Sequence, residues 1–86
     1  MRVVIPSQLR SYTCGESTVE VDGETLDEMT RALDAMFPGI RFRIIDEQER
    51  IRRHIRIFVN LAEVRTLAHR LAPTDEVHIV GALSGG

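Results

Sequence analysis

Polar and apolar side chains alternate near the beginning of the chain, as is typical of β-strands. Residues 2–5 are mainly apolar and β-branched, and Pro6, which has no backbone N–H for a sheet ladder, ends this stretch. Residues 18–21 alternate between polar and apolar side chains and lead into a turn-forming Asp-Gly pair. We therefore expect two antiparallel strands, joined by a polar turn region over residues 7–17.

The clearest local signal is a helix start at Thr25. Thr25 and Glu28 have the S/T-x-x-E spacing of a capping box, in which the side chains satisfy free backbone N–H groups of the first helical turn. The sequence Phe-Pro-Gly at residues 37–39 ends the helix, because proline cannot continue it. The apolar positions recur at helical spacing and predict a core-facing stripe rather than a cofactor site. They are Leu26, Met29, Leu33 and either Met36 or Phe37.

The second half of the chain contains one clear strand between segments that are harder to interpret. Residues 40–53 fit both strand alternation and a helical turn, so periodicity leaves their structure open. Residues 54–60 predict a strand with Ile55, Ile57 and Val59 on one face and Arg56 and Phe58 on the other. The remaining expected elements are a turn over 60–63, a short edge strand over 64–67, a helical turn over 68–72 and a final strand over 76–82.

This order of elements separates the main helix from the strands and predicts an α+β fold. Pairing of the first strand with the last, in the middle of the sheet, would complete a β-grasp (ubiquitin-like) domain. Such a domain has a mixed sheet of four to five strands packed on one main helix. The 86 residues provide enough chain for a single core. We expect the domain to span residues 1–82 and a flexible tail, ending in Gly85-Gly86, to span residues 83–86.

Composition and charge exclude several classes of function. The net charge of −2 gives no general attraction to nucleic acid. No apolar run approaches the roughly 20 residues that span a bilayer, and Pro6 falls too early for a signal peptide, so we expect a cytoplasmic protein without a membrane partner. The single cysteine, Cys14, excludes an intramolecular disulfide. All eleven basic residues are arginine, which excludes mechanisms that use a catalytic lysine.

Other candidate residues have ordinary interpretations. Cys14 is interpreted as an incidental loop residue, the alternatives being a sulfur relay and a covalent link to a partner. The three histidines lack metal-ligand spacing, and no glycine loop suited to a phosphate is present, so we expect no bound metal or cofactor. The arginines between residues 41 and 56 form a basic stretch interrupted by acids. A solvated face is the favoured interpretation of this stretch, and a surface for an acidic partner is the alternative.

Four motifs in this order point to a known family: the helix ending in Phe-Pro-Gly, Ile-Phe-Val-Asn at 57–60, Asp-Glu-Val-His-Ile-Val at 75–80, and terminal Gly85-Gly86. Together they resemble the MoaD/ThiS family of ubiquitin-like sulfur carrier proteins. The resemblance covers the whole chain, and the segment between Pro38 and His54 is similar to the MoaD or CysO type rather than to the shorter ThiS type. Many MoaD-type tails read Pro-Pro-Val-Ala-Gly-Gly, whereas residues 81–86 read Gly-Ala-Leu-Ser-Gly-Gly, which leaves the receiving pathway open.

The resemblance implies a carrier or the small subunit of a synthase complex rather than an enzyme. An activating adenylyltransferase of the MoeB/ThiF kind, using ATP and Mg, would adenylate the Gly86 carboxylate. A sulfurtransferase or another sulfur donor would then form a thiocarboxylate. A downstream synthase would use the sulfur for a product of the molybdopterin, cysteine or thiamine type. A Cβ at Gly85 or Gly86 would obstruct the in-line approach of the carboxylate to a phosphate.

The exposed face of the sheet beside the tail is the expected docking surface. Alternation places Arg56 and Phe58 of one strand, and His78 and Val80 of the last strand, on this face. An exposed aromatic residue beside an arginine suits a partner anchor, although scattered apolar residues are common on surfaces. Tail residues Leu83 and Ser84 would join the docking surface. Two other functions stay open: a ubiquitin-like modifier joined through Gly86 to target lysines, and a plain interaction domain.

Overall fold

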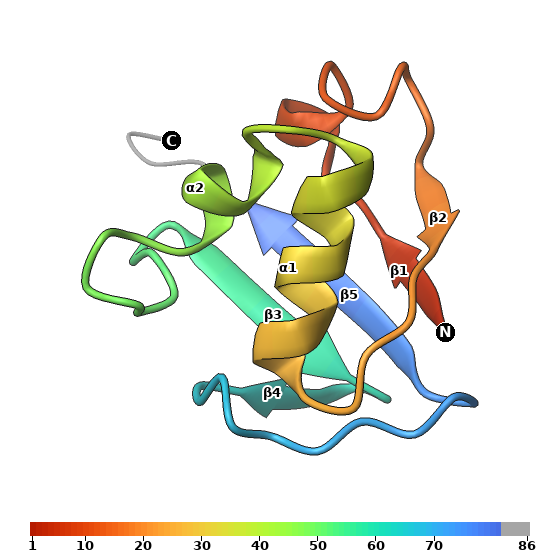
Figure 1. The fold of residues 1–86 in the computed structure, drawn as a ribbon, viewed down its shortest axis with the longest axis vertical. Helices are drawn as coiled ribbons and strands as arrows, with labels where there is room; N and C mark the ends of the chain where they lie inside the picture. Colours follow the sequence, from red (N-terminus) through yellow and green to blue (C-terminus); the bar gives the residue numbers. More distant parts are fainter. Residues whose placement is uncertain (82–86) are drawn as a thin grey trace.

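The computed structural model describes residues 1–81 of the 86-residue chain (Figure 1). Ala82, with which the predicted last strand ends, and tail residues 83–86 lie outside the described residues, as does the predicted boundary between domain and tail. In chain order the elements are β1 Arg2–Val4, the 3₁₀ helix η1 Ser7–Leu9, β2 Thr18–Glu20, α1 Leu26–Met36, α2 Ile40–Ile44, β3 Ile55–Val59, β4 Ala62–Val64 and β5 Glu76–Gly81.

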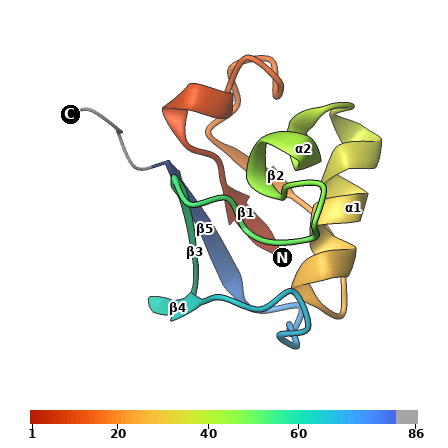
Figure 2. The ribbon, with the colours of Figure 1, turned by 90° about the vertical axis from the view of Figure 1, so that its left-hand side faces the viewer.

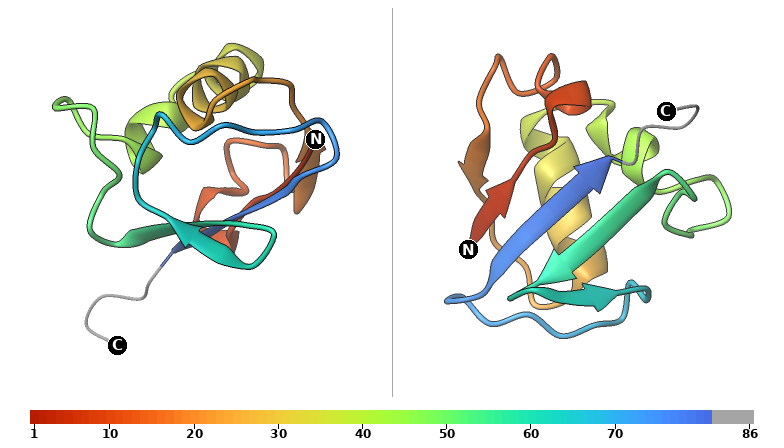
Figure 3. Two further views of the ribbon diagram at one scale, coloured as in Figure 1. Left: turned by 90° about the horizontal axis from the view of Figure 1, so that it is seen from below. Right: turned by 180° about the vertical axis from the view of Figure 1, so that it is seen from behind.

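The strands form one mixed sheet of five strands in the order β2-β1-β5-β3-β4. β1 and β5 run parallel in the middle of the sheet, with Val3 opposite Val77, whereas the other neighbouring pairs are antiparallel. Figure 3 shows β5 between β1 and β3. The predicted α+β class and the pairing of the first and last strands are therefore confirmed, and the fold is a β-grasp.

Helix α1 covers one face of the sheet and leaves the other face open (Figure 2). Alternation along the strands sends every second side chain toward α1, where these side chains form the hydrophobic core. At the end of α1, Phe37 packs against the core while Met36 remains 48% exposed, which decides between the two predicted positions. Core residues with no exposed surface include Val3, Ile5, Leu26, Met29, Leu33, Ile57 and Val77.

The predicted capping box is confirmed in its main interaction. The Glu28 amide donates to Thr25 Oγ1 over 3.2 Å. The Glu28 carboxylate accepts from the Glu24 amide over 3.1 Å, one residue earlier than in the usual reciprocal arrangement. The same part of the chain corrects the expected helical turn over residues 68–72. Ala68 lies in a turn and Arg70 forms an isolated bridge with Thr25, because the backbone at the start of α1 bonds to this segment. The Leu71 amide, for example, donates to the Glu24 carbonyl over 2.9 Å.

Residues 40–53, which periodicity left open, begin with helix α2. Gly39 adopts a left-handed φ of 98°, and Asp34 Oδ1 accepts from the Gly39 and Arg41 amides over 3.0 Å each, which together start this helix. After α2, Ile45 forms an isolated bridge with Ile51 that closes a polar loop. Tertiary packing selects the helical alternative, because it buries Ile40, Ile44 and Ile45.

The predicted edge strand over residues 64–67 is wrong by two positions. Asn60 and Leu61 both adopt positive φ, 50° and 75°, and form the two-residue turn of a tight hairpin. Pairing therefore resumes at once, with Ala62 opposite Val59, and β4 ends at Val64. Within residues 1–81, no helix has both the length and the apolar character needed to cross a bilayer.

Candidate functional site

The candidate site is the end of β5, from which the C-terminal residues continue. β5 is paired with β1 on one side and with β3 on the other, so hydrogen bonds hold it along both edges. Gly81 is opposite Ile55 and is the last described residue. The working residues expected from the sequence, Gly85 and Gly86, lie outside the described residues, together with Leu83 and Ser84. Because β5 is a central strand, it provides a rigid base for the C-terminal residues that follow Gly81.

The backbone at Gly81 is held by a residue from the other end of the chain. Gln8, in η1, donates from Nε2 to the Gly81 carbonyl over 3.1 Å. A Cβ on Gly81 would lie 2.7 Å from Gln8 Nε2, so any larger residue here would require the Gln8 side chain to move. The Gln8 amide therefore connects the last described residue of β5 to η1.

The beginning of β5 is fixed by two residues from the motifs that carry the family resemblance. Asn60 donates from Nδ2 to Asp75 Oδ1 over 2.7 Å and accepts from the Glu76 amide over 3.0 Å. The other carboxylate oxygen of Asp75 accepts from the Ala72 amide over 2.8 Å. The hydrogen bond from Ala72, followed by that from Asn60, lowers the pKa of Asp75. Asn60 and Asp75 thus position β5 at the end opposite the tail.

The four described residues of the expected docking surface lie together on the open face of the sheet. Phe58 of β3 is opposite His78 of β5, and Arg56 is opposite Val80. Arg56 and Val80 are exposed, and Phe58 and His78 are half-buried, as the alternation predicted. We refer to Arg56, Phe58, His78 and Val80 as the outer-face patch. Their grouping follows from strand register, and their role in binding stays a prediction.

Charged neighbours orient the polar members of the outer-face patch. His78 Nε2 lies 2.8 Å from Glu76 Oε1, and the Glu76 carboxylate also lies 3.4 Å from the Arg2 guanidinium. The hydrogen bond with His78 lowers the pKa of Glu76, and the charge of Arg2 acts in the same direction. Arg56 donates to Glu63 Oε2 on β4 over 3.1 Å. The patch therefore combines an aromatic ring and an aliphatic side chain with charges that are held in place.

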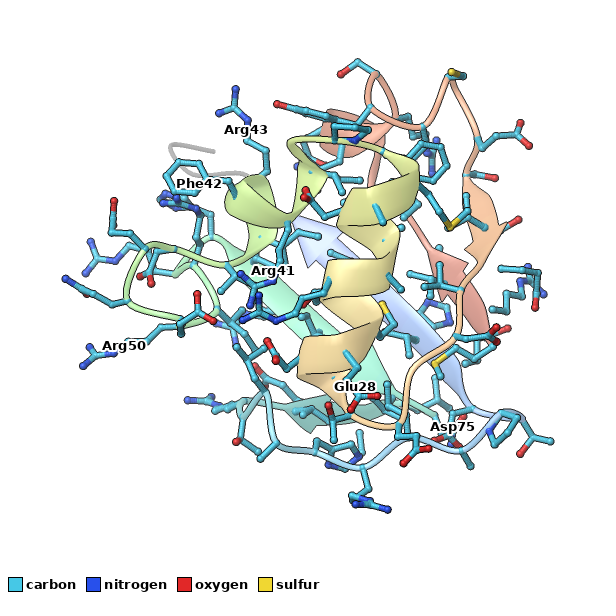
Figure 4. All side chains as sticks on the ribbon, in the orientation of Figure 1. Glu28, Arg41, Phe42, Arg43, Arg50 and Asp75 are labelled. Carbon is cyan, nitrogen blue, oxygen red and sulfur yellow. The ribbon has the colours of Figure 1, made fainter. Side chains whose placement is uncertain are left out.

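The arginine-rich stretch of residues 41–56 is not a uniform solvated face. Arg41 has a side chain only 14% exposed, and it contacts Asp27 over 2.8 Å and Glu49 over 3.0 Å. Partial burial by itself raises the pKa of Asp27, but hydrogen bonds from Arg31 and Arg41 outweigh it and bring this pKa below its ordinary value. The hydrogen bond from Arg41 also lowers the pKa of Glu49. Figure 4 shows Arg41 directed toward α1, so this arginine is structural.

The other candidate residues lie in separate segments and do not form a site at the end of β5. Cys14 is exposed in the turn before β2, with a positive φ of 56°. His54 is exposed and His69 is half-buried, and they belong to separate segments. Within residues 1–81, no group of three or more His, Cys, Asp or Glu side chains is arranged to hold a metal ion.

Sequence reasoning missed three residues that the structure places beside the outer-face patch or at the end of β5. They are Val4, Gln8 and Glu76. Val4 is opposite His78 across the parallel pair of β1 and β5. Strand alternation could have placed it on the outer face, because Val3 and Ile5 on either side of it point into the core. Glu76 could have been found by its i, i+2 spacing to His78 on one strand face. Gln8 is separated from Gly81 by 73 positions, and a contact of this range has no local signal.

Comparison with known proteins agrees with this geometry. The ThiS family matches residues 3–86. The sulfur carrier protein CysO of Mycobacterium tuberculosis is 36% identical over 89 residues, which cover 98% of this chain and 96% of that protein. The crystal structure of the Amycolatopsis orientalis BexX/CysO complex contains a chain with 34% identity and a TM-score of 0.92, covering 99% of this chain and 98% of that one. SAMP1 of Haloferax volcanii, a small archaeal modifier protein, has 26% identity and a TM-score of 0.79, covering 100% of this chain and 98% of that one. The chain therefore belongs to the ThiS family.

Proposed function

We propose that this protein is a sulfur carrier whose working group is the α-carboxylate of Gly86. The observation that carries the proposal is the position of the C-terminal diglycine. It follows the central strand of a β-grasp domain, in a chain that the ThiS family matches through residue 86. The similarity to CysO, which is named as a sulfur carrier protein, supports the same function. The domain acts as a handle, and the chemistry takes place at the end of the tail.

The length of the tail suits delivery into a partner's active site. Five residues follow Gly81, and an extended chain of this length reaches at most about 18 Å. The β-grasp domain can thus remain outside an enzyme whose catalytic groups are buried. Gly85 and Gly86 lack side chains, so the carboxylate can approach a phosphate through a narrow channel.

The reaction proceeds through two substitutions. In the active site of an activating adenylyltransferase that binds ATP and Mg²⁺, a Gly86 carboxylate oxygen attacks the α-phosphorus and pyrophosphate leaves. Hydrosulfide provided by the sulfur donor then attacks the acyl carbon and AMP leaves, which forms the thiocarboxylate. The mixed anhydride replaces a poor leaving group by a good one and divides a difficult substitution into easier steps. A downstream synthase then takes the sulfur.

The outer-face patch is the docking surface for these partners, with Leu83 and Ser84 of the tail extending it. An aromatic ring packed beside an arginine is the type of anchor that contributes most to protein interfaces. The patch lies on β3 and β5, and the start of the tail lies where β5 ends and the antiparallel β3 begins. That a related CysO forms a complex with BexX supports docking of this fold on a partner protein.

Conjugation to other proteins is a second candidate function. It is favoured by the similarity to SAMP1, a small archaeal modifier protein. The same adenylated Gly86 would react with the amine of a target lysine instead of with sulfide. This chain has no lysine and could serve only as the donor.

Intact-mass spectrometry tests the proposed function. The protein is incubated with ATP, Mg²⁺, sulfide and its cognate activating enzyme. We expect a gain of about 16 Da, because sulfur replaces one carboxylate oxygen. Deletion of Gly86 should abolish this gain without changing the free energy of unfolding. A wild-type protein that keeps its mass under these conditions would contradict the carrier function.

A variant extended by one alanine beyond Gly86 is the matched control. It retains a terminal carboxylate and the whole domain but places a Cβ at the reacting residue. We expect no thiocarboxylate from this variant, because the side chain obstructs in-line approach. Isopeptide-linked Gly86 on other proteins in a cell lysate would identify the second candidate function instead.

A further inference from the structure

A cleft of about 480 Å³ lies where β3 and β4 separate. The ladder between these strands extends only to Ile57 opposite Val64. Beyond Val64 the chain turns toward α1, where the Leu67 carbonyl accepts from the Asp27 amide over 2.9 Å. The loop that leads into β3 forms the opposite wall. Of the residues that line the cleft, only Arg56 also belongs to the outer-face patch.

Arginine side chains dominate the lining of the cleft, although the protein as a whole carries a net charge of −2. Two carboxylates also line it, and both are already paired. Glu49 binds Arg31 and Arg41, which lie outside the cleft, and Glu63 is shared by two arginines of the lining. The arginines that line the cleft are Arg50, Arg52, Arg53, Arg56 and Arg65.

Three of these arginines have charge available for a ligand. Within the described part of the chain, no carboxylate lies within ion-pair distance of Arg50, Arg52 or Arg53. Arg52 is held in position, since its Nε donates to the Phe42 carbonyl over 2.7 Å and its guanidinium lies 4.5 Å from the centre of the Phe42 ring. Figure 4 shows Arg50 at the outer side of the loop. The cleft therefore presents an excess of positive charge.

The wall beneath the arginines is apolar. Ile51, Ile55 and Leu67 line the cleft and are only partly buried, so they are available to an apolar group. A single small anion would leave this surface and most of the 480 Å³ to water. An acidic peptide with an apolar side chain between its carboxylates satisfies both the charge and the apolar wall.

The cleft also lies beside the start of the tail. Ile55 and Arg56 line it, and across the β3–β5 ladder they are opposite Gly81 and Val80. A segment bound in the cleft would therefore belong to a protein that is close to the tail.

We propose that this cleft binds an acidic segment of the partner enzyme that receives the tail. Carboxylates of the segment pair with Arg50, Arg52 and Arg53, and an apolar side chain contacts Ile55 and its neighbours. Assignment of the segment to that enzyme rests on the proposed carrier function, whereas the binding chemistry does not. Charge complementarity of this kind accelerates association and discriminates against partners with a basic surface.

NMR titration of the full-length, ¹⁵N-labelled protein tests the binding chemistry directly. The probe is a short peptide of alternating Glu and Leu, and its matched control has Lys in place of Glu. We expect the acidic peptide to shift amide signals of residues 50–57 and 63–67, with an affinity that falls as salt is added. The double variant Arg50→Glu/Arg53→Glu should weaken binding by about tenfold or more.

Arg70→Glu provides a control with the same kind of charge change at an exposed residue that does not line the cleft. It should retain nearly all of the peptide affinity. Equal losses in the Arg70 variant and in the cleft variants would overturn the proposal, as would shifts centred on other residues. Tighter binding of inorganic tripolyphosphate or of an oligonucleotide at the same residues would also overturn it. Arg50→Ala/Arg53→Ala repeats the test should charge reversal impair folding.

Steady-state adenylation with the activating enzyme tests the assignment to the partner. We expect Arg50→Glu/Arg53→Glu to raise KM by about tenfold with kcat unchanged, because these residues contribute to association only. An unchanged KM would contradict the assignment. Absence of adenylation of the wild-type protein would contradict the carrier function, while the peptide titration would still decide whether the cleft binds an acidic segment.

Discussion

At the scale of single residues, two glycines are closely approached by other atoms, one by helix backbone and the other by a side chain. A Cβ on Gly23 would lie 2.6 Å from the backbone nitrogen of Met29 in α1. A Cβ on Gly81 would lie 2.7 Å from the end of the Gln8 side chain. The two distances are similar, but helix backbone cannot move without disturbing the core, whereas a long side chain can change rotamer.

Alanine at Gly23 should therefore destabilise the fold much more than alanine at Gly81. We expect Gly23→Ala to lower the free energy of unfolding by about 2–3 kcal/mol, since α1 has to shift. Gly81→Ala should lower it by less than about 1 kcal/mol, the value of one exposed hydrogen bond. Urea denaturation of the two variants measures both values. Equal losses of unfolding free energy in the two variants would show that the chain before α1 relaxes freely around the new Cβ.

A double-mutant cycle between Gly81 and Gln8 isolates their contact. Gln8→Ala removes the hydrogen bond and also the group that the new Cβ would meet. We expect the combination of Gln8→Ala with Gly81→Ala to be no less stable than either single variant, because both remove the same interaction. Additive losses, measured by denaturation, would contradict the close contact.

At the scale of elements, α1 is held at its start by a side-chain cap and along its exposed face by ion pairs. Thr25 Oγ1 accepts from the Glu28 amide at the first turn. Arg41, at the start of α2, reaches back to Asp27 on α1 and to Glu49 in the following loop. These contacts join the two helices and the loop along one flank of α1.

Removal of the cap should destabilise the helix by the amount typical of such caps. We expect Thr25→Ala to lower the free energy of unfolding by about 1 kcal/mol, because one amide of the first turn loses its acceptor. Thr25→Ser keeps the hydroxyl and should lie close to wild type. Thermal or urea denaturation distinguishes the two. A serine variant as unstable as the alanine variant would assign the effect to lost methyl packing.

The ion pairs of Asp27 and Glu49 predict a loss of stability in acid. Their carboxyl pKa values lie below the ordinary 3.8 and 4.5 in the folded protein, so the unfolded chain binds more protons near these values. The stabilisation is complete above about pH 4.5 and is lost as the pH falls through the lowered folded-state pKa values. Denaturation at a series of pH values measures this slope.

Arg41→Gln is the control for this pH dependence. It removes one cation from both carboxylates and leaves Arg31, so the dependence of stability on pH below 4.5 should become weaker without disappearing. At neutral pH the variant should be less stable by about 1–2 kcal/mol, because it loses hydrogen bonds of a partly buried guanidinium. A slope equal to that of wild type would show that other carboxylates determine the acid response.

At the scale of the whole molecule, one face of the sheet forms the core and the other carries the proposed docking surface. Its inner face contributes the core against α1, and its outer face carries the outer-face patch beside the start of the tail (Figure 2). A substitution on the outer face can therefore change partner affinity while the fold persists.

Phe58→Ser should raise KM for the activating enzyme by about tenfold, the effect of removing an aromatic anchor. It should lower the free energy of unfolding by only about 1 kcal/mol, because Phe58 is half-buried and contributes mainly cross-strand contacts. Leu61→Ser is the control, since Leu61 is 86% exposed in the β3–β4 turn and lies outside the patch. Steady-state kinetics of adenylation provide the measurement. A similar KM for both variants would exclude the patch as the docking surface.

Much of the fold could be predicted because its signals are local. The helix cap, the apolar stripe of α1 and the alternation of β3 and β5 depend on neighbours within a few residues, and all were confirmed. The segment over residues 40–53 and the edge strand β4 could not be determined in this way. Burial of Ile40, Ile44 and Ile45 selected a helix for the former, and positive φ at the β3–β4 turn set the register of the latter.

The same distinction between local signals and contacts of distant segments applies to the candidate site. The sequence by itself determined that the chain ends in two glycines after a strand, and that Arg56, Phe58, His78 and Val80 share one face of the sheet. These properties follow from residue order and from the period of a strand. Only the tertiary structure decided that Gln8 holds Gly81 and that Arg41 is structural. It alone decided that five arginines line one cleft, because these contacts join segments that are far apart in the chain.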